Sequence, residues 1–285
     1  MTGDSAFSST LPPVVTRHRT IAFTSGKGGV GKSNVVLNTG IAMARRGRRV
    51  MILDGDLGLA SINVLLGLSP RFDLRHVLAG ERPLRDIVLH GPHGLSIVPA
   101  GSGIAELANL GGDDRETLLA QLQPMAESVD YLLIDTGAGI SDTVLNLVAA
   151  SDEAIVITRP EPTALADAYA LIKVVVQHEP AFPFHLLINM VRDARQAEQV
   201  FGSLEQILVR FLGYQPGNAG FVPTDPRVGE GVVHQMPFTL RAPQCAAARG
   251  VEALAERILG EKANESGPRR AGGFWQRLGR WGRGA

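Results

Sequence analysis

The stretch TSGKGGVGKSNVV, residues 24–36, lies between two apolar runs and decides the fold. Gly26, Gly31, Lys32 and Ser33 match the pattern G-x-x-x-x-G-K-[ST], which joins a strand to a helix in proteins that bind nucleoside phosphates. The glycines let backbone N–H groups curl around phosphate oxygens, and the helix N-terminus adds a partial positive charge. The spacing predicts that Lys32 reaches the β- and γ-phosphates and that the Ser33 hydroxyl ligates Mg²⁺.

Short apolar runs alternate with helical patterns on both sides of this loop. The predicted strands cover residues 19–25, 48–54, 95–98, 131–135, 153–158, 184–189 and 218–223. The predicted helices cover residues 33–47, 113–127, 141–150, 164–178, 195–212 and 247–262. The strands are almost continuously apolar, which is typical of a parallel sheet covered on both faces. We therefore expect an α/β fold with a doubly wound, mostly parallel sheet and helices on both faces.

Composition narrows the class of protein and its compartment. The 285 residues are 45% hydrophobic, and 28 basic residues balance 28 acidic ones, so no net charge favours nucleic acid. A single cysteine, Cys245, excludes a disulfide framework and a cluster bridged by two cysteines of one chain. No signal peptide or membrane span is apparent, so we expect a cytoplasmic protein. We divide the chain into a disordered tail (1–17), a nucleotide-binding domain (18–262), a linker (263–273) and an amphipathic helix (274–285).

Carboxylates follow two of the predicted strands. Asp54 and Asp56 come directly after one strand, and Asp135 ends another. The carboxyl ends of parallel strands form one edge of the sheet, where α/β proteins bind ligands. An acid such as Asp135 can hold Mg²⁺ there through its water shell. The alternative for Asp54 is that it caps the next turn.

The C-terminal stretch GGFWQRLGRWGRGA differs from the rest of the chain. Arginines alternate with an apolar helical face formed by Phe274, Trp275, Leu278 and Trp281. This pattern is typical of an interfacial membrane anchor, and we expect two copies on a dimer to bind far better than one. The alternative is that the helix docks on its own domain or on a partner protein.

Lys27 follows the first glycine of the loop, so the loop carries two lysines. The order K-G-G-V-G-K-S resembles the deviant Walker A loop of the MinD/ParA group of ATPases. The resemblance implies that Lys27 crosses a dimer interface and touches the nucleotide of the partner subunit. A second ammonium near the γ-phosphate neutralises charge that spreads over the transferred group. ATP hydrolysis would then be slow, dependent on Mg²⁺ and dependent on dimerisation.

The same resemblance implies roles for individual residues. Lys27, Lys32 and Asp56 would be catalytic, with Asp56 orienting and deprotonating the attacking water. Ser33, Asp54 and Asp135 would hold Mg²⁺, and Gly137 would belong to a switch loop that senses the γ-phosphate. The implied nucleotide-binding residues are Gly26, Lys27, Gly28, Gly29, Val30, Gly31, Lys32, Ser33, Asn34, Asn189, Pro223 and Asp225.

The base is predicted to be adenine. The N-K-x-D motif expected of a GTPase does not occur in the sequence. Asn189 lies at a predicted strand end instead, and Pro223 and Asp225 lie at a later one. In the resembled family an asparagine at this point bonds adenine, and a proline-containing segment lines the base pocket. The alternative is that Asn189 and Asp225 are ordinary loop residues.

Several longer stretches resemble the flagellar-number regulators, the FlhG or FleN family. They are DGDLGLASINVLLGL, DTGAGISDTVLN and EPTALADAYALIKVV. This resemblance implies an ATP-dependent homodimer at the inner membrane surface that limits the number and placement of flagella. Its implied partners are an FlhF-type GTPase, a flagellar transcription activator and components of the flagellar switch ring. The DQAxxLR-like segment of members that stimulate the GTPase is not seen before the first strand, so that activity is in doubt.

Two alternatives to this function stay open. One is a related ATPase that positions another cargo, at the division site or in DNA partition. The other is a nucleotide-binding antagonist of a flagellar transcription activator that acts without turnover. The tryptophans interleaved with arginines in the tail favour lipid over DNA, so direct binding to nucleic acid is not expected.

Overall fold

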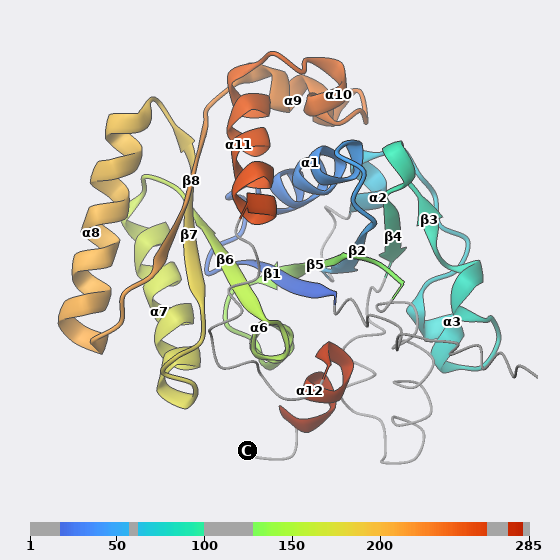
Figure 1. Cartoon of the computed structure of the whole chain (residues 1–285), viewed down its shortest axis with the longest axis horizontal. Coiled ribbons are helices and arrows are strands. Elements are labelled where there is room, and N and C mark those ends of the chain that lie inside the picture. Colours follow the sequence, from blue (N-terminus) through green and yellow to red (C-terminus); the bar gives the residue numbers. More distant parts are fainter. Residues whose placement is uncertain (1–17, 57–61, 100–127, 261–272, 282–285) are drawn as a thin grey trace, which may run out of the picture.

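An eight-stranded sheet runs through the molecule, with helices on both faces (Figure 1). The computed structural model describes residues 18–56, 62–99, 128–260 and 273–281. The strands are β1 (Arg19–Ser25), β2 (Val50–Gly55), β3 (Leu89–His90), β4 (Ser96–Pro99), β5 (Tyr131–Ala138), β6 (Glu153–Thr158), β7 (Phe184–Val191) and β8 (Gly217–Pro223). Their order is β3-β4-β2-β5-β1-β6-β7-β8, and each described pair is parallel except β3–β4. The prediction of a doubly wound, mostly parallel sheet is confirmed.

The helices form two layers, one on each face of the sheet. The layer that contains the first helix consists of α1 (Lys32–Arg45), α2 (Ile62–Leu65), α9 (Pro226–Val233), α10 (Phe238–Arg241) and α11 (Ala246–Gly260). The opposite layer consists of α3 (Leu74–Leu78), α6 (Asp142–Ala150), α7 (Pro162–His178), α8 (Ala194–Leu212) and α12 (Phe274–Trp281). Two short 3₁₀ turns, Leu84–Asp86 and Pro92–Gly94, flank β3.

Alternating side chains of the central strands supply both layers. In β1, Ile21 and Phe23 pack beneath α1 and α11, whereas Ala22 faces the layer of α6 and α7. In β5, Leu133 points to the first layer, and Ile134 points to the second. Successive residues of a strand face opposite sides, so a run that is apolar at every position fills two cores at once.

The predicted elements that lie within the described residues are confirmed within a few residues. Several short elements of the structure were not predicted. The sequence did not predict α2, α3, α9, α10 or the antiparallel β3, none of which exceeds eight residues. Runs this short contain too few turns to display a helical period. The predicted helix at 113–127, the tail at 1–17 and the linker up to residue 272 lie outside the described residues.

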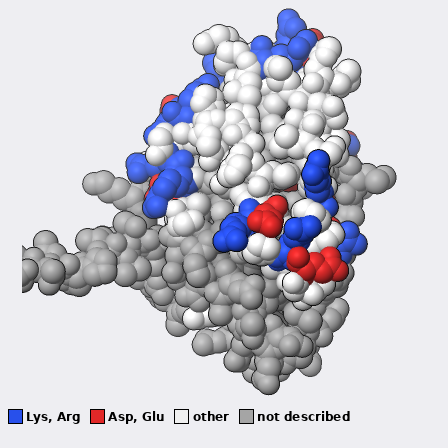
Figure 2. Space-filling view, turned by 90° about the vertical axis from the view of Figure 1, so that its right-hand side faces the viewer, with Lys and Arg blue, Asp and Glu red and all other residues white. Residues whose placement is uncertain are grey.

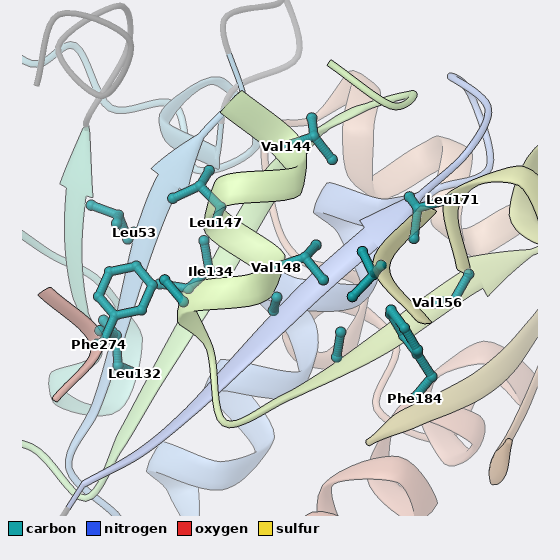
Figure 3. Packing of buried hydrophobic residues seen from close by; sticks show 14 of the residues in the cluster. Leu53, Leu132, Ile134, Val144, Leu147, Val148, Val156, Leu171, Phe184 and Phe274 are labelled. Carbon is teal, nitrogen blue, oxygen red and sulfur yellow. The ribbon is translucent and has the colours of Figure 1, made fainter. Parts of the chain in front are cut away.

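The C-terminal helix α12 packs on α6. Phe274, Trp275 and Leu278 are 1%, 2% and 5% exposed, and they belong to the cluster that contains the apolar side chains of α6. Figure 3 shows Phe274 beside Leu132, Ile134 and Leu53 of the sheet.

Polar contacts fix the same helix. Arg277 Nε donates to the carbonyl oxygen of Ala150 at 2.7 Å, and Arg277 Nη2 pairs with Asp152 Oδ1 at 2.7 Å. Residues 274–281 are helical, as predicted. Their contacts show the helix docked on its own domain, which is the alternative to a free membrane anchor. The side chain of Trp281 lies outside the described part of the chain.

Candidate nucleotide site

The Gly-rich loop joins β1 to α1 in a conformation that only glycine tolerates at several points. Gly29 and Gly31 have φ values of 76° and 85°, in the left-handed region. A Cβ atom on Gly26 would lie 2.2 Å from the backbone of Asp167 in α7, so the loop packs against that helix without room for a side chain. The loop leads directly into the N-terminus of α1, where backbone N–H groups can bind phosphate.

Lys32 is the first residue of α1 and points into a group of acids. Its side chain is 6% exposed, and Nζ donates to Asp135 Oδ1 at 2.6 Å. Asp56 Oδ2 lies 3.5 Å from the same Nζ. The Ser33 side chain also hydrogen-bonds to Asp135. The structure thus brings the lysine and serine of the loop to the acids predicted at the ends of β2 and β5.

Asp54 and Asp135 are direct neighbours in the β2–β5 ladder. Asp54 Oδ2 accepts from the backbone N–H of Ile62, the first residue of α2, at 2.9 Å, a contact that agrees with the alternative of a cap for the segment after β2. Burial, followed by the charge of Asp135, raises the pKa of Asp54 to about 7. Burial also raises the pKa of Asp135, although Lys32 opposes the shift.

These residues fit a divalent cation. Asp54 Oδ1 and Asp135 Oδ2 are buried and have no hydrogen-bond partner among the described residues. Buried carboxylate oxygens of this kind, next to a serine hydroxyl, are the hard ligands that Mg²⁺ prefers. Ser33, Asp54 and Asp135 are therefore the residues that would hold Mg²⁺, and the cation would stabilise negative charge on the phosphates.

Asp56 lies at the mouth of the site rather than inside it. Its side chain is 23% exposed, in contrast to the fully buried Asp135. A Cβ atom on Gly137, at the end of β5, would lie 3.9 Å from Asp56 Oδ1. Asp56 can thus reach both solvent and the predicted switch loop, as a residue that activates water must.

Lys27 turns away from these acids. Its Nζ donates to Glu161 Oε2 at 3.1 Å and to Thr163 Oγ1 at 2.8 Å, at the start of α7. Glu161 also pairs with Arg159, which precedes α7. Sequence reasoning missed Arg159, Glu161 and Thr163, although their position directly after β6 places them at the same edge of the sheet.

Asn189 lies beside the loop, and Pro223 ends the neighbouring strand β8. Asn189 is 6% exposed, and its Nδ2 donates to the carbonyl oxygen of Val30 at 2.7 Å. Asn189 Oδ1 accepts from the backbone N–H of Met190 at 2.9 Å. The β7–β8 register pairs Asn189 with Val222, next to Pro223. Asn189 therefore contacts the phosphate loop directly.

Asp225 has a different role from the one expected. Its carboxylate accepts from the backbone N–H groups of Arg227 at 2.9 Å and Ala246 at 2.8 Å. It thereby caps α9 and holds the first residue of α11. These backbone hydrogen bonds keep the pKa of Asp225 low against the effect of burial, which is the largest influence on it. These contacts agree with the alternative of a structural loop residue, and contact of Asp225 with the base stays a prediction.

The strand–loop–helix unit, its buried lysine and the acids on two adjacent strands occur together in P-loop nucleoside triphosphatases, and they define the class of this protein. Comparison with known sequences narrows the class. Residues 16–259 match the ParA family, described as the NUBPL iron-transfer P-loop NTPase. The chain belongs to the ParA/MinD family.

Individual relatives agree with this assignment. The chain is 39% identical over 238 residues to the antiactivator FleN of Pseudomonas aeruginosa. These residues make up 84% of this chain and 85% of FleN. It is 34% identical over 187 residues to the flagellum site-determining protein YlxH of Helicobacter pylori, covering 66% of this chain and 63% of YlxH. The MinC:MinD cell division complex of Aquifex aeolicus contains a chain of similar fold, with a TM-score of 0.67, 25% identity, and coverage of 85% of this chain and 96% of that one.

No helix among the described residues has the length and apolar character required to cross a bilayer. Nor do three or more His, Cys, Asp or Glu side chains meet there in an arrangement that could hold a metal ion. The Mg²⁺ site above relies on two aspartates and a serine.

Proposed function

We propose that this protein is an ATP-dependent switch that dimerises on ATP, associates with the inner membrane surface and regulates the number and placement of flagella. The observation that supports it most is the direction of Lys27. Lys32 already points to the acids of its own subunit, whereas the side chain of Lys27 points to the start of α7 and is 34% exposed. A lysine in that position is available to a nucleotide that a second subunit carries.

The proposed reaction is hydrolysis of ATP to ADP and phosphate. Asp56 orients the attacking water and accepts its proton. Lys32 stabilises the phosphates in its own subunit, and Lys27 adds a positive charge from the partner as charge develops on the γ-phosphate. Turnover is slow because the site is complete only in the dimer.

ATP is proposed as the nucleotide, with Asn189 and Pro223 beside the base. Asn189 spends one N–H on Val30, and its second N–H is left to meet an adenine ring nitrogen. The absence of an N-K-x-D sequence supports adenine over guanine.

The helix α12 is proposed to bind lipid only after it leaves α6. Phe274, Trp275 and Leu278 are buried against the domain in this arrangement, so a bilayer has to compete for them. The docking partner α6 follows the segment around Gly137, which senses the nucleotide in the proposed cycle. A shift of that segment on dimerisation would loosen α12, and two released helices would hold the dimer on the membrane.

The proposed partners follow from the relatives. The name of FleN describes an antiactivator, and that of YlxH describes a flagellum site-determining protein. We therefore propose contacts with a flagellar transcription activator, an FlhF-type GTPase and the flagellar switch ring. The described part of the face in Figure 2 combines a broad uncharged area with Lys and Arg side chains, some of which lie next to Asp and Glu.

Replacement of Asp56 by Ala tests whether turnover is part of this function. We expect the variant to bind ATP and dimerise, because Asp56 lies at the mouth of the site, but to hydrolyse ATP at least about 100-fold more slowly. In a flagellated host that lacks the gene, cells with the variant should carry the wrong number of flagella under the microscope. Normal flagellar number without turnover would instead support the antagonist that acts without hydrolysis.

A further inference from the structure

Glu161 is shared by two cations from different segments. Its Oε2 accepts from Lys27 Nζ at 3.1 Å, and its Oε1 pairs with the guanidinium of Arg159. Thr163 Oγ1 accepts a second hydrogen bond from Lys27 at 2.8 Å. Lys27 is thus held at the start of α7 by a carboxylate that is already paired with another positive charge.

Arg159 has neighbours other than Glu161. Its Nη1 lies 3.4 Å from the carbonyl oxygen of Gly29 in the phosphate loop and 3.8 Å from Met190 Sδ. It precedes Glu161 by two residues, and the backbone N–H of Glu161 donates to the Arg159 carbonyl oxygen at 2.6 Å. The side chain is also less exposed than that of Lys27, at 28% against 34%. Arg159 can therefore stay with Glu161 when Lys27 leaves.

We propose that Arg159 and Glu161 form a positioning pair for Lys27. In the separate subunit, Glu161 holds Lys27 against α7. When Lys27 moves to the nucleotide of a second copy, Arg159 keeps the carboxylate of Glu161 paired. This inference rests on the proposed dimer and adds two residues to it.

The departure of Lys27 leaves the carboxylate of Glu161 without one of its two positively charged partners. An unpaired carboxylate beside a triphosphate would raise the energy of the dimer by charge repulsion. Arg159 prevents this, and its own positive charge weakens the hold of Glu161 on Lys27. The pKa of Glu161 is held below its usual value first by Arg159 and then by Lys27, which agrees with Arg159 as the stronger partner.

Four variants test the pair through the dissociation constant of the dimer with Mg²⁺ and a non-hydrolysable ATP analogue. We expect Glu161→Gln to tighten the dimer about threefold, because Lys27 starts free, and Arg159→Gln to weaken it about threefold, in the range of partly exposed ion pairs. Arg159→Lys should keep most of the parent affinity. In the double variant, Arg159→Gln should have little further effect, because the carboxylate through which Arg159 acts is absent.

A matched control uses Glu256, an exposed carboxylate that pairs with Arg46 at 2.7 Å on the opposite layer. Glu256→Gln changes the net charge equally and should leave the dissociation constant unchanged. Sedimentation equilibrium gives all these values, and thermal unfolding checks that each variant is folded.

Different results would overturn different claims. Weaker or unchanged dimerisation of Glu161→Gln would overturn the positioning pair. An equal effect of Arg159→Gln in the parent and in Glu161→Gln would show that Arg159 acts through the phosphate loop instead. A parent that stays a single subunit would overturn the proposed dimer and the inference together. So would a Lys27→Ala variant that dimerises as well as the parent.

Discussion

Burial and a neighbouring negative charge both disfavour the ionised form of Asp54. Its pKa is about 7 in the folded chain against an ordinary value of 3.8, because of burial and the neighbouring Asp135. Folding therefore binds a proton between these pH values, and the stability that depends on this proton is full below about pH 4 and is lost as pH rises through 7. We expect Asp54→Asn to raise the free energy of unfolding of the ligand-free protein at pH 8 by about 1–3 kcal/mol.

Urea unfolding at pH 5.5 and pH 8 measures this effect. The parent should lose stability between the two pH values, and the variant should lose less, with the remainder from Asp135. An identical loss in both proteins would contradict the assignment of a raised pKa to Asp54.

Two glycines of the phosphate loop give a matched pair at the same scale. A Cβ atom on Gly26 would meet the backbone of Asp167 at 2.2 Å, whereas one on Gly28 would have no neighbour within 4 Å. We expect Gly26→Ala to lower the free energy of unfolding by about 2 kcal/mol or more, because a backbone contact cannot yield as a side chain can. Gly28→Ala should change it by less than about 0.5 kcal/mol. Equal values in urea unfolding would show that the loop does not pack on α7 as described.

At the scale of elements, the docking of α12 can be weakened from the side of the domain. Asp152 pairs with Arg277 at 2.7 Å, so Asp152→Asn removes that ion pair and leaves the sequence of α12 unchanged. We expect several-fold more protein to float with anionic vesicles in the absence of nucleotide, since partly exposed ion pairs contribute up to about 1 kcal/mol. Faster amide hydrogen exchange in residues 274–281 should accompany the change.

Glu256→Gln is the control for the loss of one negative charge, because Glu256 lies on α11 in the opposite layer, away from α12. It should float as the parent does. If Asp152→Asn also floats as the parent does and exchanges at the parent rate, the ion pair does not hold α12 in place.

The elements also show where sequence reasoning succeeds and where it stops. The central positions of β1 and β5, Ile21–Phe23 and Leu132–Ile134, are continuously apolar, a pattern that specifies a buried parallel strand. The loop pattern placed Gly26 to Ser33 at the junction of β1 and α1. The destination of α12 could not be predicted, because Phe274, Trp275 and Leu278 present the same face to a bilayer or to α6. The contacts of Lys27 with Glu161 join residues 134 positions apart, so local sequence carries no signal of them.

At the scale of the whole molecule, the account depends on an exchange between two copies of the chain. In the proposed dimer, each subunit supplies a lysine that its own site does not use, and Glu161 and Thr163 hold that lysine at the start of α7 before a partner binds. Nucleotide, dimer and membrane are then linked in one cycle, in which a bound triphosphate favours the dimer and the dimer favours release of α12. Every later step depends on the first.

The mass of the particle in solution tests that first step most directly. The chain has a mass of 30.3 kDa, and sedimentation of the parent with Mg²⁺ and a non-hydrolysable ATP analogue should give twice that value, whereas ADP should give the single subunit. Lys27→Ala should still bind the analogue and remain a single subunit at concentrations where the parent is dimeric. A parent that keeps the mass of one chain with the analogue, both in solution and on anionic vesicles, would contradict the account.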